Sequence, residues 1–125
     1  MIEIVHVSND TELDGIGNNA DNDDDNDGVL DENDAFPLDA TESVDTDLDG
    51  IGNNTDTDDD NDGIPDESDA FPLDATESTD TDLDGIGNNA DTDDDDDGVP
   101  DESDAFPLDA TESTDTDLDG IGNNA

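Results

Sequence analysis

Acidic side chains stand at alternate positions along most of this chain of 125 residues. The run that starts at Asp45 has a carboxylate at positions 1, 3, 5 and 12, a glycine at position 6 and an asparagine at position 9. Ca²⁺ takes about 6–8 oxygen ligands, and a twelve-residue loop can supply them from alternate side chains and a backbone carbonyl at position 7. Glycine at position 6 permits the sharp turn of such a loop, since it has no Cβ. The spacing therefore predicts a calcium-binding loop.

Seven loops of this type, in two alternating kinds, follow one another along the chain. First-kind loops contain the sequence DGIGNN and begin at Asp10, Asp45, Asp80 and Asp115. Second-kind loops have an aspartate at position 9 and begin at Asp23, Asp58 and Asp93. A single residue separates the end of a first-kind loop from the start of the next loop, so neighbouring ions should lie close enough to share carboxylates.

The predicted metal ligands are the residues at positions 1, 3, 5, 9 and 12 of each loop. In the first-kind loops they are Asp10, Glu12, Asp14, Asn18, Asp21, Asp45, Asp47, Asp49, Asn53, Asp56, Asp80, Asp82, Asp84, Asn88, Asp91, Asp115, Asp117, Asp119 and Asn123. In the second-kind loops they are Asp23, Asp25, Asp27, Asp31, Asp34, Asp58, Asp60, Asp62, Asp66, Asp69, Asp93, Asp95, Asp97, Asp101 and Asp104. The last loop reaches Ala125 before its position 12, so we expect a longer parent chain, or a neighbouring molecule that completes the loop by head-to-tail association.

The loops recur in pairs with a period of 35 residues, which is the spacing of Phe36, Phe71 and Phe106. Such a period is typical of stacked repeats that contact mainly their neighbours. Each repeat holds one loop of each kind and a linker such as LDATEST. We expect repeats at residues 10–44, 45–79 and 80–114, a truncated repeat at 115–125, and a non-repeat segment at 1–9 whose MIEIVHV sequence predicts one short β-strand.

Charge and composition make cations part of the predicted fold. The chain has 44 acidic residues and no Lys or Arg, which gives a net charge of −44, and only 26% of its residues are hydrophobic. It cannot neutralise itself or bury a core that offsets the entropy of ordering, so without cations we expect disorder. One Ca²⁺ in each of seven loops would bring −44 only to −30, so we expect several ions per repeat.

Further acids recur in phase outside the five ligand positions of each loop. They are candidates for extra or outer-shell contacts to the ions. They are Asp24, Asp59 and Asp94; Glu32, Glu67 and Glu102; Asp39, Asp74 and Asp109; and Glu42, Glu77 and Glu112.

The alternation of DxDxDGxGNxxD with DxDxDGxxDxxDxxP resembles the thrombospondin type 3 repeat, and the resemblance covers nearly all of residues 10–125. It implies calcium motifs that wrap around lines of Ca²⁺ with little helix or sheet. The aspartates at the ligand positions given above would hold the ions. The family also has cysteines, and this chain has none, so the disulfides that the family uses are absent here.

Other functions fit the sequence less well. EF-hands need helices beside each loop, for which the gaps leave no room, and no break in the repeat forms the cleft of an enzyme. Nucleic-acid binding needs Lys or Arg, and the chain has no long apolar run for membrane insertion. An acidic calcium reservoir or mineral-binding protein without fixed structure stays open as the main alternative. A domain that holds a ligand through surface calcium would need a site that departs from the repeat, and the sequence shows none.

The sequence thus predicts an irregular fold with few secondary structures, an elongated rod of turns and loops stapled by multiple Ca²⁺ ions, at least one per loop. Loops that are filled at rest belong where calcium is abundant, so we expect a secreted or extracellular protein. MIEIVHV lacks the basic start of a signal peptide, so the signal should lie upstream in a parent chain, unless this is an excised fragment. The predicted role is a stiff spacer, stalk or filament segment of an adhesin or matrix.

Overall fold

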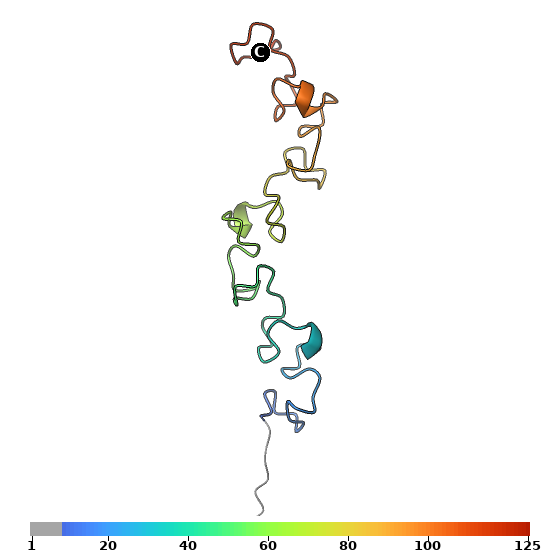
Figure 1. Ribbon diagram of the computed structural model, residues 1–125, viewed down its shortest axis with the longest axis vertical. Coiled ribbons are helices and arrows are strands. Elements are labelled where there is room, and N and C mark those ends of the chain that lie inside the picture. Colours follow the sequence, from blue (N-terminus) through green and yellow to red (C-terminus); the bar gives the residue numbers. More distant parts are fainter. Residues whose placement is uncertain (1–8) are drawn as a thin grey trace, which may run out of the picture. The chain divides into compact units, whose positions relative to one another are not determined.

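The computed structural model describes residues 9–125, and the chain forms two units, Met1–Asp59 and Asp60–Ala125. In each unit the described backbone runs through turns, bends and short loops (Figure 1). The regular elements of the described residues are three single turns of 3-10 helix, η1 (Asp31–Asn33), η2 (Asp66–Ser68) and η3 (Asp101–Ser103). The predicted irregular fold with few secondary structures is confirmed. The predicted N-terminal strand lies outside the described residues.

Each 3-10 turn connects position 9 of a second-kind loop to position 12. In η3 the Ser103 N–H donates to the carbonyl of Pro100 at 2.7 Å, and the Asp104 N–H donates to the carbonyl of Asp101 at 3.2 Å. Pro100 suits the residue before the turn, because its ring holds φ near the observed −59° and the turn needs only its carbonyl. The turn is short, as is usual for 3-10 structure, and it brings Asp104 back toward its own loop.

Buried side chains in this fold are acidic rather than apolar. Across residues 9–125 no hydrophobic side chain is buried, and the buried residues with polar or charged side chains include Asp25, Asp95, Glu42, Glu77 and Glu112. The three phenylalanines are only half-buried. The order of the described backbone therefore comes from backbone hydrogen bonds and from hydrogen bonds to carboxylates, and hydrophobic burial contributes little to it.

The linker between repeats is held at both ends by backbone hydrogen bonds. In the second unit the Ala70 N–H donates to the carbonyl of Ser78 at 3.1 Å, and the Asn88 N–H donates to the carbonyl of Thr79 at 2.9 Å. Within the linker the Glu77 N–H donates to the carbonyl of Asp74 at 2.9 Å. The linker thus joins the end of one second-kind loop to the middle of the following first-kind loop.

A leucine with left-handed backbone stands at position 4 of every first-kind loop. The φ angles lie between 61° and 65°, and the side chains are 82–84% exposed, at Leu13, Leu48, Leu83 and Leu118. Left-handed φ costs an L-residue about 1–2 kcal/mol, and asparagine tolerates it better than leucine. The exposed leucines therefore strain the loops without adding buried apolar surface.

Replacing Leu83 by asparagine is expected to stabilise the protein by about 1 kcal/mol, because it relieves this backbone strain. The measurement is calorimetric melting in saturating calcium, in which the L83N variant should melt at a higher temperature than the parent. Leu73, which is 61% exposed and does not have a positive φ, provides the matched control, and L73N should not raise the melting temperature. A lower melting temperature for L83N would mean that the leucine itself stabilises the loop.

Candidate metal centre

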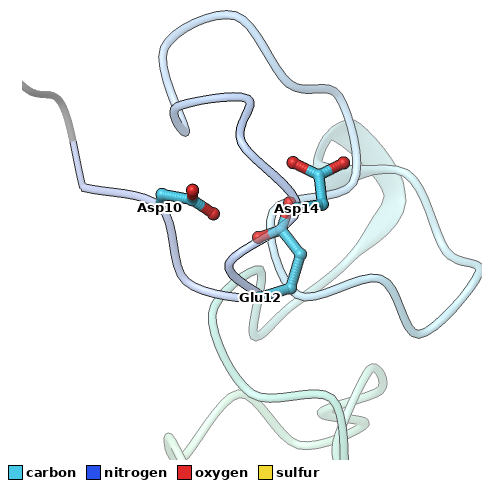
Figure 2. A group of neighbouring side chains, drawn as sticks. All are labelled: Asp10, Glu12 and Asp14. Atoms are coloured by element: carbon cyan, nitrogen blue, oxygen red, sulfur yellow. The ribbon is translucent and has the colours of Figure 1, made fainter.

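The acids at positions 1, 3 and 5 of a loop gather around one point. In the first loop the side chains of Asp10, Glu12 and Asp14 rise from one turn of backbone, and one oxygen of each lies within 4.8 Å of the others (Figure 2). The same grouping occurs in further loops, among them those with Asp23, Asp25 and Asp27; Asp45, Asp47 and Asp49; and Asp80, Asp82 and Asp84, each contained in one unit. The structure therefore brings together the acids that the spacing predicted.

One oxygen of each carboxylate folds the loop by accepting a backbone N–H. In the loop from Asp93, the Oδ2 of Asp93 accepts the Gly98 N–H at 3.2 Å, and the Oδ1 of Asp95 accepts the Asp97 N–H at 3.1 Å. Aspartate does this readily, because its short side chain reaches the backbone two residues on. Gly98 has a φ of 93°, which shows that position 6 needs the glycine.

In several of these carboxylates the second oxygen is buried and has no hydrogen-bond partner. In the same loop these atoms are Asp93 Oδ1, Asp95 Oδ2 and Asp104 Oδ2. Leaving a buried charged oxygen unpaired is costly, and a hard cation with oxygen ligands removes that cost. Similarly placed oxygens elsewhere are Asp10 Oδ1, Asp23 Oδ1, Asp25 Oδ2, Asp34 Oδ2, Asp45 Oδ1 and Asp47 Oδ2. The donor set therefore fits Ca²⁺.

Mutual repulsion of the carboxylates also indicates a place for a cation. Burial raises the pKa of Asp25, an N–H bond from Asp27 opposes the rise, and the charges of Asp27, Asp34 and Asp23 add to it. The influence of Asp34 brings the position-12 acid into the same group as positions 1, 3 and 5. A divalent cation among them would replace this repulsion by attraction.

Two acids at position 2 of second-kind loops belong to the same groups, although the ligand spacing does not include them. Burial raises the pKa of Asp94, and the charges of Asp101 and Asp91 raise it further. Its Oδ1 is buried without a hydrogen-bond partner, as is that of Asp24. Asp91 closes the preceding first-kind loop, so Asp94 faces acids of two loops. The only sequence signal for it was its recurrence every 35 residues.

The asparagine at position 9 of each first-kind loop is bound to the threonine at position 2. In the loop from Asp80, the Oδ1 of Asn88 accepts the Thr81 N–H at 3.0 Å, and its Nδ2 donates to the Thr81 hydroxyl at 2.7 Å. Asn18, Asn53 and Asn123 make the same pair of bonds with Thr11, Thr46 and Thr116. The amide thus closes the loop, and its role as a calcium ligand remains a prediction.

The recurring aspartates of the linker accept hydrogen bonds from a nearby threonine. In the linker the Oδ1 of Asp74 accepts both the N–H and the hydroxyl of Thr76, at 3.1 and 2.6 Å, and these bonds lower the pKa of Asp74. Asp39 and Asp109 make the same bonds with Thr41 and Thr111. These aspartates stabilise a turn of the linker, and their outer-shell role remains a prediction.

A family model for the thrombospondin type 3 repeat matches three consecutive segments, residues 9–42, 44–77 and 79–114. The chain belongs to the thrombospondin type 3 repeat family. This family consists of structural repeats that bind calcium, and it is not an enzyme family. The thrombospondin type 3 repeats of this chain are therefore calcium-binding repeats. A comparison with curated proteins finds no match. Among the described residues there is no helix with the length and apolar character to cross a membrane.

Two of the seven loops lie at special places in the chain, one at the boundary between the units and one at the end of the sequence. The second-kind loop that begins at Asp58 contains the boundary between the two units, so its ligand set, with Asp60, Asp62, Asp66 and Asp69, stays a prediction from the sequence. In the last loop the Gly120 N–H donates to the Oδ2 of Asp115 at 2.9 Å, as in the other first-kind loops. The last loop thus folds in the same way up to Ala125.

Proposed function

We propose that Ca²⁺ fills every loop of this array and thereby converts an acidic coil into an ordered spacer. The observation that supports the proposal is made in the loop from Asp93, where one carboxylate oxygen of Asp93 and of Asp95 accepts a backbone N–H and the other oxygen is buried without a hydrogen-bond partner. The ligands would be the acids at positions 1, 3, 5 and 12, with the aspartate at position 9 in second-kind loops. Asp24 and Asp94 would serve a further ion.

The role that follows is mechanical. A spacer ordered by Ca²⁺ suits a stalk, fibre or filament segment of a surface or matrix protein, because calcium is abundant outside cells and such modules work with a Kd of about 10⁻⁴–10⁻³ M. Secretion, a role in adhesion, and growth by head-to-tail association or within a longer parent chain are parts of this proposal. The repeats would lie at residues 10–44, 45–79 and 80–114, with a partial repeat at 115–125.

Small-angle X-ray scattering of the full chain tests the proposal. In chelator we expect an expanded coil with a radius of gyration of at least about 36 Å, because the unfolded chain follows coil scaling and is further extended by its charge. Millimolar Ca²⁺ should change this profile to that of a thin rigid rod. Mg²⁺ at the same concentration should not, since it prefers octahedral sites and keeps its water. A coil profile in Ca²⁺ together with full calcium uptake would favour the disordered reservoir instead.

A further inference from the structure

Three buried glutamates receive hydrogen bonds from the loop that follows them. Glu42, Glu77 and Glu112 lie near the ends of their linkers and are only 6–8% exposed, and the chain has no Lys or Arg to pair with them. Their Oε2 atoms accept the backbone N–H groups of Asn54, Asn89 and Asn124 at 2.9–3.0 Å. Each glutamate thus binds a residue 12 positions ahead, at position 10 of the next first-kind loop.

A glycine at position 8 of that loop makes room for the glutamate. A Cβ built on Gly87 would lie 2.1 Å from the Oε2 of Glu77, and Gly52 and Gly122 stand in the same relation to Glu42 and Glu112. Gly87 does not have a positive φ, so its backbone conformation does not require glycine. At Gly52, Gly87 and Gly122 the close approach of the glutamate therefore leaves no room for a Cβ.

A second bond binds the same asparagine to the linker. The Nδ2 of Asn89 donates to the carbonyl of Thr76 at 2.7 Å, next to the Glu77 bond, and the neighbouring Asn88 N–H donates to the carbonyl of Thr79. Linker and loop are thus joined by one carboxylate bond and two bonds to backbone carbonyls. We call this joint the clasp; in the second unit it is formed by Thr76, Glu77, Thr79, Gly87, Asn88 and Asn89.

We propose that Glu42, Glu77 and Glu112 are positioning residues, and that each fixes the conformation of the following first-kind loop before calcium binds. The clasp holds positions 8 to 10, which lie between the acids at positions 1, 3 and 5 and the closing acid at position 12. Fixing that segment before the ion arrives lowers the entropy that binding must overcome. The inference rests on the proposed calcium function and adds that the affinity of a loop depends on the linker before it.

The first loop of the chain lacks this glutamate. Its counterpart of Glu42, 35 residues earlier, is Val7, which has no side-chain acceptor. The loop from Asp10 otherwise has the same Gly17 and Asn18 pattern. The loops from Asp45, Asp80 and Asp115 are therefore the ones whose conformation a glutamate carboxylate would fix before calcium binds.

Terbium luminescence can read the affinity of one loop in the full chain. The chain has no Trp or Tyr, so the single indole of an L83W variant would sensitise Tb³⁺ in the loop from Asp80, and displacement by Ca²⁺ gives the calcium affinity. In this background E77A should weaken calcium binding roughly tenfold, as expected for one lost hydrogen bond to a charged group. E77Q should retain near-parental affinity, because an amide oxygen can still accept the Asn89 N–H.

The glycine supplies a second, independent variant. G87A should weaken binding about as much as E77A, because its Cβ would displace the carboxylate, and the double variant E77A/G87A should be no weaker than E77A alone. An L48W reporter in the loop that follows Glu42 should be unaffected by all three changes.

Two results would overturn the inference while leaving calcium binding intact: unchanged affinity in E77A, or an E77Q variant as weak as E77A, which would make the glutamate a charged ligand. An L83W loop that binds neither Tb³⁺ nor Ca²⁺ would overturn the proposed function, and the inference with it.

Discussion

Chelating calcium is expected to release the hydrogen bonds that join linker and loop. In saturating Ca²⁺ the amides of Asn53, Asn88 and Asn123, which donate to linker carbonyls at 2.9 Å, should be protected from hydrogen exchange. In chelator they should exchange on the order of 100-fold faster or more, because a loss of about 3 kcal/mol of local stability corresponds to that factor. The reason is that no buried apolar side chain within residues 9–125 offsets the repulsion of acids whose oxygens lie within 4.8 Å.

Salt provides the control for this experiment. At about 1 M NaCl the Debye length falls to roughly 3 Å, so general repulsion is screened while the buried oxygens still lack a coordinated ion. Protection should therefore stay low in chelator with high salt and return only on addition of Ca²⁺. Protection that persists in chelator, or that salt alone restores, would show that coordination is not what orders the loops.

Replacing Asp95 by asparagine is expected to remove calcium from its loop. Asp95 is 7% exposed, its Oδ1 accepts the Asp97 N–H, and its Oδ2 is the unpaired atom. Asparagine can keep the first interaction but places an NH₂ group where the cation would bind. We expect at least a 100-fold loss of affinity at this loop, about 3 kcal/mol, as for removal of one partner of a buried ionic contact. Calorimetric titration with Ca²⁺ should then show at least one ion fewer per chain.

Asp109 provides the matched control, because D109N makes the same chemical change at an exposed aspartate. Its Oδ1 accepts the N–H and hydroxyl of Thr111, which an amide oxygen can also do. The number of bound ions should be unchanged in D109N. Equal loss in both variants would point to net charge rather than coordination, and no loss in D95N would remove Asp95 from the ligand set.

The loops themselves could be predicted from the sequence because their contacts are local. Alternate acids and the glycine at position 6 lie within twelve residues, so spacing alone indicates that Asp80, Asp82 and Asp84 can approach one another. The absence of a buried apolar side chain in the described residues likewise follows from composition. What spacing could not indicate is which oxygen of Asp95 holds the backbone and which is left for an ion.

The roles of the other recurring acids depended on the three-dimensional path of the linker. Asp94, Asp74 and Glu77 recur with the same period, yet one faces acids of two loops, one caps a turn and one enters the clasp. A signal for the clasp did exist. The glycine at position 8, unlike that at position 6, is not required by a calcium loop, and it stands ten residues after the glutamate in every case where the glutamate is present.

The short reach of the clasp has a consequence for how such an array changes length over evolutionary time. Its longest bond joins residues 13 apart, well within the 35-residue period. An unequal crossover between two copies of the repeat, at any in-phase point, would therefore restore each clasp and each loop in the longer or shorter product. Gene duplication can thus set the number of repeats without any compensating substitution, and the number of calcium loops becomes a trait that recombination adjusts in steps of one repeat.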